Sequence, residues 1–236
     1  MPVFYQQTID RHTKIGIWKI EEPEQFFLQT VPLQNEITHP HKRLQHLAGR
    51  YLLRYLFPDF PFDLIRIADT RKPFLENESY HFSISHCGDF AAAIVSSNKR
   101  VGVDVEIFSE KIERVKEKFI SKPEETMLVD FAGYNHYNKY LTLIWSCKES
   151  IFKWYGSGQL DFRKHMQLQG IHFDELREII QADFLFAKGK SQLLNLRSVF
   201  LEKFVLSWML TDIFLHEPHK PHRPIRTDHP GGHIGT

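Results

Sequence analysis

The alternation of hydrophobic and polar positions divides the chain into a helix, a group of strands, more helices and a second group of strands. Residues 14–20 (KIGIWKI) alternate as a strand does, whereas residues 39–57 repeat apolar side chains at helical spacing. The runs YHFSISH, FAAAIVSS and VGVDVE follow with tight turns between them, and we expect an antiparallel meander. Helical patterns occupy residues 109–119 and 140–156, the capping-box spacing of SKPE (residues 121–124) predicts the start of another helix, and three more strands follow. This order predicts an α+β fold.

The strand VGVDVE carries two acids within an apolar run. Asp104 and Glu106 share one face with Gly102, and the three valines share the other face, because side chains alternate along a strand. The two acidic Cα atoms would lie about 6.7 Å apart, so both carboxylates could reach one hard cation such as Mg²⁺. Gly102 could let a ligand approach the backbone. Alternatively, this is a solvent-exposed face that is acidic by chance, and the hexapeptide alone favours that interpretation.

The helix that contains WSCKESIFK adds a third acid. Trp145, Glu149 and Lys153 fall at i, i+4 and i+8, on one stripe of a helix whose other positions are largely apolar. An acid and a base on a buried helix need partners. They could simply pair with each other for a modest gain in stability. In the functional interpretation, Glu149 gives a third carboxylate to the metal and Lys153 gives a cation to a phosphate.

Composition narrows the possible classes of function. The 236 residues include 30 basic and 29 acidic side chains, so net charge gives no indication of nucleic-acid binding. Two cysteines are too few for a disulfide scaffold and favour a reduced, intracellular setting. The first residues lack a signal-peptide pattern, and no apolar run approaches the roughly 20 residues of a membrane helix. We therefore expect a cytoplasmic protein that does not bind membranes.

Candidate phosphate-binding residues lie around the acids in the sequence. RKPF (residues 71–74) is basic, Ser85 and His86 end a predicted strand, and the helix over residues 39–57 has a basic face. The glycine-rich phosphate loops, the G-x-S-x-G elbow and H-E-x-x-H are absent from the sequence. Three acids with several cations form the set of side chains that a phosphate and Mg²⁺ require.

The segments RKPF, FSISHCG, VGVDVE and WSCKESIFK, in this order, resemble the Sfp-type 4′-phosphopantetheinyl transferases. The resemblance implies two similar α+β halves in one monomeric chain, with the active site in the cleft between them. It implies Mg²⁺-dependent transfer of the 4′-phosphopantetheine arm of coenzyme A to a serine of an apo acyl, polyketide or peptidyl carrier protein, with release of 3′,5′-ADP. We assign residues 1–108 and 109–214 to the halves. Residues 215–236, rich in Pro, Gly and His, are expected to be a disordered tail.

The resemblance also implies roles for individual residues. Asp104, Glu106 and Glu149 match the metal ligands, and Glu149 is also the candidate base. Lys153 matches a catalytic lysine that contacts the coenzyme A phosphates. Lys72 matches another lysine that contacts coenzyme A, and Ser85 with His86 matches a pair near its 3′-phosphate. Arg43 and Arg50 lie in the basic helix that usually helps to hold the nucleotide. The chain departs from the family at Arg71, where Gly is usual, and at Cys87, where Ser is common.

Two other functions remain open at this stage. One is another Mg²⁺-dependent phosphotransferase or a nuclease, although the near-neutral charge argues against a long polyanionic substrate. The other is a protein that binds coenzyme A or a carrier without catalysis. The presence of Asp104, Glu106, Glu149 and Lys153 together argues against a purely binding function.

Overall fold

Four strands from the first part of the chain form an antiparallel sheet. The computed structural model describes residues 3–32 and 37–213. The strands are β1 (Val3–Asp10), β2 (Thr13–Lys19), β5 (His81–Cys87) and β6 (Phe90–Ser96), in the order β1-β2-β6-β5. The alternating pattern of residues 14–20 thus forms a strand as predicted. The predicted hairpin of YHFSISH and FAAAIVSS forms as well.

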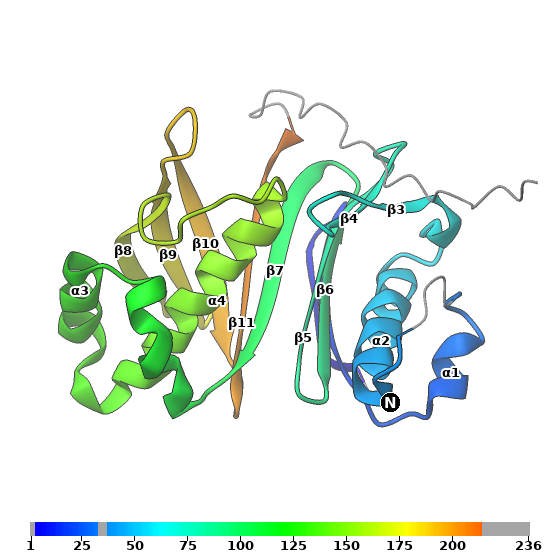
Figure 1. Ribbon diagram of the computed structural model, residues 1–236, viewed down its shortest axis with the longest axis horizontal. Helices are drawn as coiled ribbons and strands as arrows, with labels where there is room; N and C mark the ends of the chain where they lie inside the picture. The colour runs from blue at the N-terminus through cyan, green and yellow to red at the C-terminus, as the bar shows by residue number, and fades with distance from the viewer. Residues whose placement is uncertain (1–2, 33–36, 214–236) are drawn as a thin grey trace, which may run out of the picture.

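Helix α2 (Pro40–Leu56) covers one face of this sheet (Figure 1). Its apolar stripe, including Leu47 and Leu52, packs on Trp18 and Phe82 of the sheet. Pro40 starts the helix after His39, whose ring accepts a hydrogen bond from the backbone N–H of Lys42. Short elements complete this part of the fold: α1 (Glu24–Leu28), the 3₁₀ turn η1 (Phe62–Leu64), and the hairpin of β3 (Ile65–Ile67) with β4 (Pro73–Leu75).

A second antiparallel sheet has five strands in the order β7-β11-β10-β9-β8. Helix α4 (Tyr137–Tyr155) lies on one face and ends at Gly156, which adopts the left-handed conformation with φ of 72°. Smaller helices beside it are η2 (Glu110–Lys118), α3 (Lys122–Ala132) and η3 (Tyr134–His136). The strands are β7 (Lys99–Ile107), β8 (Met166–Asp174), β9 (Ile179–Phe186), β10 (Gln192–Phe200) and β11 (Phe204–Asp212).

The predicted three-stranded meander is only partly correct. Strands β5 and β6 pair, but β7 leaves them and pairs antiparallel with β11, where Asp104 lies opposite Ser207. Both faces of β7 are largely buried. Its valines face the first sheet and its other face contacts α4, so the strand lies between the first sheet and this helix. Figure 1 shows β7 in the middle, with α4 and β11 on one side and β5 on the other.

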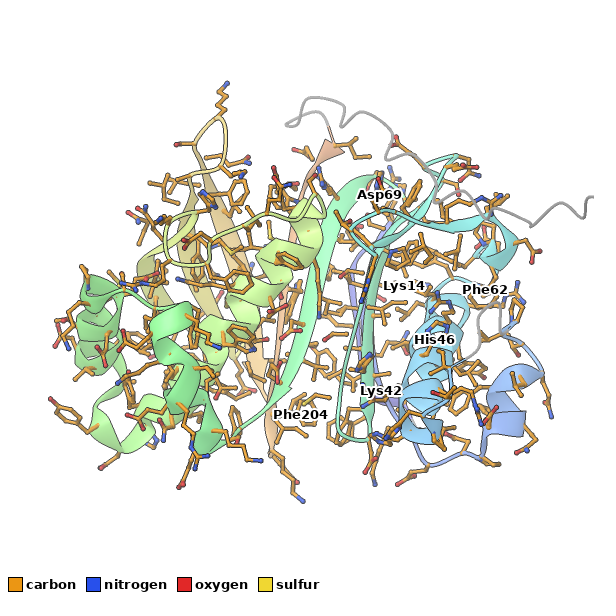
Figure 2. All side chains as sticks on the ribbon, viewed as in Figure 1. Lys14, Lys42, His46, Phe62, Asp69 and Phe204 are labelled. Atoms are coloured by element: carbon orange, nitrogen blue, oxygen red, sulfur yellow. The ribbon has the colours of Figure 1, made fainter. Side chains whose placement is uncertain are left out.

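An apolar layer joins the two sheets. The three valines of β7 pack against residues of β2 and β6 such as Ile17 and Ile94. At one end of this layer the ring of Phe204, labelled in Figure 2, contacts the rings of Phe4 and Phe90. The molecule therefore stacks as α2, first sheet, second sheet and α4, which confirms the α+β class.

Other expectations about organisation stay predictions. The division at residue 108 and the similarity of the two halves are not decided by this arrangement, and the tail at 215–236 lies outside the described residues. No helix in the described ranges is long and apolar enough to cross a membrane.

Candidate active site

Close packing of α4 on β7 creates the candidate site. A Cβ atom at Gly102 would lie 2.2 Å from the carbonyl oxygen of Ser150 and 2.8 Å from Cβ of Trp154, so only glycine lets the helix lie so near the strand. We had expected Gly102 to admit a ligand to the backbone, and this is wrong: the helix occupies that space. The contact brings Glu149 and Lys153 to the acidic face of β7.

Asp104 is held by two other side chains. Its Oδ1 atom accepts from Lys153 Nζ at 2.6 Å and from Ser85 Oγ at 2.8 Å. Lys153 also donates to Ser85 Oγ at 2.8 Å. Asp104 is 3% exposed, and its Oδ2 atom is buried without a hydrogen-bond partner among the described residues. One oxygen of this carboxylate is thus fully engaged, and the other still needs a partner.

Each carboxylate oxygen of Glu106 accepts one hydrogen bond. The indole N–H of Trp145 donates to Oε1 at 3.1 Å, and the thiol of Cys87 donates to Oε2 across 3.7 Å. Burial and the charge of Asp104 raise the pKa of Glu106. Burial also raises the pKa of the Cys87 thiol to about 11, so the sulfur remains a protonated donor near neutral pH.

Glu149 completes the group of three acids. It is half-buried on α4, and burial, followed by the charge of Asp104, raises its pKa to about 7. Glu106 adds to this effect, whereas Lys153 opposes it. The three predicted ligands therefore lie close enough to influence one another's charge. A carboxylate with a pKa near neutrality can accept a proton at physiological pH.

This donor set fits Mg²⁺ in its chemistry. The group offers carboxylate oxygens alone, the ligands that Mg²⁺ prefers, and one of them, Asp104 Oδ2, has no other partner in the described structure. Within residues 3–32 and 37–213, no three His, Cys, Asp or Glu side chains already stand at the spacing of a complete metal site. The ammonium of Lys153 instead provides the positive charge on Asp104.

The cations Lys72 and Arg100 bind the end of α4. Lys72 Nζ donates to the carbonyl oxygen of Trp154 at 3.2 Å, and Arg100 Nε donates to the same oxygen at 2.9 Å. Burial and the charge of Arg100 lower the pKa of Lys72 to about 7. Lys72 was predicted to bind coenzyme A, and here its ammonium contacts the helix terminus. Arg100 was not singled out, although it directly precedes VGVDVE.

A second basic group lies between α2 and β5. Arg50 donates to the ring of His46 at 3.0 Å, and burial with the charge of Arg50 lowers the pKa of His46 to about 4. His86 lies near enough to His46, labelled in Figure 2, to contribute to this lowering of the His46 pKa. Partial burial and Lys153 lower the pKa of His86. His46 was missed, and its signal is the i, i+4 spacing from Arg50 on one helix face.

Arg43 lies apart from these groups. Its guanidinium donates to Glu24 Oε2 through Nη2 at 2.8 Å and Nε at 2.9 Å. A further bond runs from Nη1 to the carbonyl oxygen of Ile37 at 3.1 Å. The contacts tie α1 to α2, so Arg43 has a clear structural role in the described conformation.

A buried ion pair that no sequence pattern indicated lies beneath the site. Lys148, the neighbour of Glu149, is fully buried and donates to Glu124 Oε1 at 2.6 Å and to the carbonyl oxygen of Phe119 at 2.6 Å. Glu124 also accepts from the backbone N–H of Ser121, as the predicted capping box requires. The pair fixes α4 to the start of α3, and so fixes the helix that carries Glu149.

The chain is similar to known proteins over part of its length. Residues 100–206 match the family described as the 4′-phosphopantetheinyl transferase superfamily. The chain is 36% identical over 115 residues to enterobactin synthase component D of Escherichia coli strain K12, covering 48% of this chain and 54% of that protein. It is 31% identical over 112 residues to 4′-phosphopantetheinyl transferase gsp of Aneurinibacillus migulanus, covering 48% of this chain and 46% of that protein.

A mammalian protein is similar as well. The match to the L-aminoadipate-semialdehyde dehydrogenase-phosphopantetheinyl transferase of Mus musculus is 31% identical over 150 residues, covering 54% of this chain and 46% of that protein. The chain spans about half the length of the curated relatives it matches. The matched family segment contains β7 and α4, which carry the three acids. Residues 100–206, which include all three acids and Lys153, are therefore the part of this chain that is similar to the 4′-phosphopantetheinyl transferase superfamily.

Proposed function

We propose that the protein transfers the 4′-phosphopantetheine arm of coenzyme A to a serine of an apo acyl, polyketide or peptidyl carrier protein. The observation that carries this proposal is the meeting of Asp104, Glu106 and Glu149 at the contact of β7 with α4, beside Lys153. Relatives named as phosphopantetheinyl transferases support it. The protein acts as a monomer in this proposal, because both elements of the site belong to one chain.

The proposed reaction is a phosphoryl transfer. The serine hydroxyl oxygen forms a bond to the β-phosphorus of coenzyme A, the bond from that phosphorus to the oxygen of 3′,5′-ADP breaks, and the serine proton passes to Glu149. Glu149 suits this role because its pKa of about 7 lets it be ionised at neutral pH and still hold a proton. Lys153 offsets negative charge that develops on the leaving phosphate.

Asp104, Glu106 and Glu149 would hold Mg²⁺ in this proposal. The ion would neutralise the pyrophosphate and make its phosphorus more electrophilic. The basic groups around Lys72 and around Arg50 with His86 would hold the nucleotide part of coenzyme A. Each group contains a partly buried cation, Arg50 or Lys72, whose pKa is lowered by burial, so an anion would stabilise its charged form. Arg43, bonded to Glu24, would have to give up that pair to join them.

The proposal is tested by incubating the protein with coenzyme A, Mg²⁺ and several apo carrier proteins, and measuring the intact mass of each carrier. We expect one phosphopantetheine arm per carrier with the wild-type protein. Glu149→Gln should lower the rate by at least about 100-fold, the order of a general-base contribution. Glu175→Gln, a change at an exposed acid in the β8–β9 turn, is the matched control and should transfer normally.

Other outcomes would contradict the role of Glu149 or favour one of the two alternative functions. Wild-type turnover by a folded Glu149→Gln protein would contradict the role of that residue. Tight binding of coenzyme A with no mass gain on any carrier would favour the binding protein without catalysis. Cleavage of polynucleotides would favour the nuclease.

A further inference from the structure

Serine side chains join the two sheets at the edge of β7. Strand β7 is an edge strand of the second sheet, and the backbone N–H groups of Val103 and Val105 point away from β11. Ser83 Oγ accepts from Val103 N at 3.2 Å, and Ser85 Oγ accepts from Val105 N at 3.3 Å. The two contacts advance together along the strands, so β5 and β7 run in the same direction. Hydroxyls here replace the carbonyl oxygens of a normal ladder.

The two serines differ in what else they bind. Ser85 Oγ also donates to Asp104 Oδ1 at 2.8 Å and accepts from Lys153 Nζ at 2.8 Å. A hydroxyl has one hydrogen to donate and two lone pairs to accept with. All three are used at Ser85, since Val105 and Lys153 fill the lone pairs and Asp104 takes the hydrogen. Ser85 could bind a phosphate only by giving up one of these partners.

The arrangement also determines which oxygen of Asp104 is available. Ser85 and Lys153 both bind Oδ1, and this leaves Oδ2 buried and without a hydrogen-bond partner in the described part of the chain. Without the Ser85 hydroxyl, Asp104 could rotate and Lys153 could share its charge between both oxygens. Ser85 therefore acts on the metal-binding geometry through Asp104.

We propose that Ser85 is a positioning residue that orients Asp104 and Lys153 across the sheet junction, and that it does not bind the 3′-phosphate of coenzyme A, the role implied by the family resemblance. The proposal rests on the proposed function for its choice of ligands. His86, the next residue, points to the opposite face of β5, toward α2, and remains free to serve the nucleotide.

The test measures binding without turnover. Mg²⁺ and coenzyme A are titrated calorimetrically into the wild-type protein, Ser85→Ala and the matched control Ser83→Ala, and coenzyme A is compared with 3′-dephospho-coenzyme A. Ser83→Ala loses the same kind of junction bond but no contact with Asp104 or Lys153. We expect Ser85→Ala to weaken Mg²⁺ binding by about 10- to 100-fold, the usual effect of removing a residue that orients a metal ligand. Ser83→Ala should leave Mg²⁺ binding within about twofold of wild type, because it touches no ligand.

The two coenzymes separate positioning from phosphate contact. In the absence of Mg²⁺, we expect Ser85→Ala to change the affinity for both coenzymes equally, because any effect through Lys153 acts on phosphates that both coenzymes carry. A loss seen with coenzyme A but not with its 3′-dephospho form would overturn the proposal. So would unchanged Mg²⁺ affinity in Ser85→Ala, or no Mg²⁺ binding by the wild-type protein with or without coenzyme A.

Two further comparisons separate the role of Ser85 from a folding defect in the variant and from a failure of the proposed function. If Ser85→Ala does not fold, Ser85→Cys keeps the size of the side chain and weakens only its hydrogen bonds, so the same comparison applies. A wild-type protein that binds Mg²⁺ but modifies no carrier would contradict the proposed function, and the Mg²⁺ titrations would still decide the role of Ser85.

Discussion

At the scale of single residues, three carboxylates lie close together at the contact of β7 with α4, and the ammonium of Lys153 offsets part of their charge. Burial, followed by the charge of Asp104, raises the pKa values of Glu106 and Glu149. Glu149 carries the largest resolved effect among them, with a pKa of about 7 against an ordinary value of 4.5. In the metal-free protein, ionising Glu106 and Glu149 therefore costs extra free energy, and a bound cation would lower that cost.

This cost predicts a dependence of stability on pH. A folded-state pKa above the unfolded value means that the folded protein binds the proton more tightly, so stability from Glu149 is full below about pH 4.5 and is lost as pH rises toward 7. The loss is at most about 3 kcal/mol, because one pKa unit corresponds to about 1.4 kcal/mol and solvent screening reduces the effect. Urea denaturation of the metal-free protein at pH 5 and pH 8 measures it.

Glu149→Gln is the comparison for that measurement. The variant cannot ionise at this position, so its unfolding free energy should fall less than that of the wild-type protein between the two pH values. Equal changes in the two proteins would mean that Glu149 is not perturbed in the folded state.

The backbone at Arg71 adopts a conformation that favours glycine, the residue that the family resemblance implies at this position. Its φ is 65°, in the left-handed region, and its backbone N–H donates to the carbonyl oxygen of Ala68 at 2.8 Å in the turn between β3 and β4. A residue with a side chain pays about 1–2 kcal/mol in this conformation. Glycine avoids that cost but loses more freedom on folding.

We therefore expect Arg71→Gly to change the unfolding free energy by no more than about 1 kcal/mol, in the stabilising direction or near zero. Arg71→Val should destabilise the protein by about 1–2 kcal/mol, because a β-branched side chain fits the left-handed region poorly. Thermal and urea denaturation distinguish the two variants. Stabilisation by valine would refute the backbone explanation.

At the scale of elements, the contact of α4 with β7 leaves no room for a side chain at Gly102. Gly102→Ala would place a methyl group 2.2 Å from a backbone oxygen of α4, so the helix must shift. We expect destabilisation of about 1–3 kcal/mol from overpacking and a weaker Mg²⁺ affinity, since Glu149 moves with the helix. Denaturation and Mg²⁺ titration measure the two effects.

Gly170→Ala provides the control for crowding. Its new methyl group would meet only the ring of His172, 3.2 Å away, and this exposed ring can move. The change should cost less than about 1 kcal/mol and leave Mg²⁺ binding intact. If both glycine variants behave alike, the close approach of α4 to β7 is not the cause.

At the scale of the whole molecule, the apolar layer between the sheets couples the two halves. Val103 is fully buried in one apolar cluster with Ile17 and Ile94 of the first sheet and Leu206 of the second. A core of this kind opens only when both sheets separate. We expect one cooperative unfolding transition, with Trp18 in the first half and Trp208 in the second reporting the same midpoint.

Val103→Ala tests that coupling. Loss of two buried carbon atoms should cost about 2 kcal/mol and shift the transition of both halves together. Hydrogen exchange followed by mass spectrometry reports each half separately. Faster exchange confined to one sheet would show that the halves unfold independently.

Local patterns in the sequence determined which side chains of β7 and α4 share a face and where α3 begins. The alternation of VGVDVE placed Asp104 and Glu106 on one face, helical spacing put Glu149 and Lys153 on one stripe, and the capping box marked the start of α3. These features depend only on neighbours along the chain, because the periods of strand and helix decide which side chains share a face. The ordered motifs also indicated the superfamily that residues 100–206 match.

Only the tertiary structure decided how distant segments meet. Strand β7 pairs with β11, about a hundred residues later, rather than with its neighbour β6; Gly102 receives a helix; and Ser85 uses its whole hydroxyl on Val105, Asp104 and Lys153. Lys72 likewise bonds to the carbonyl oxygen of Trp154 and Arg43 to Glu24, and no local sequence pattern predicts these partners. Such contacts follow from burying several faces at once and satisfying each buried polar group, and no short segment contains that information.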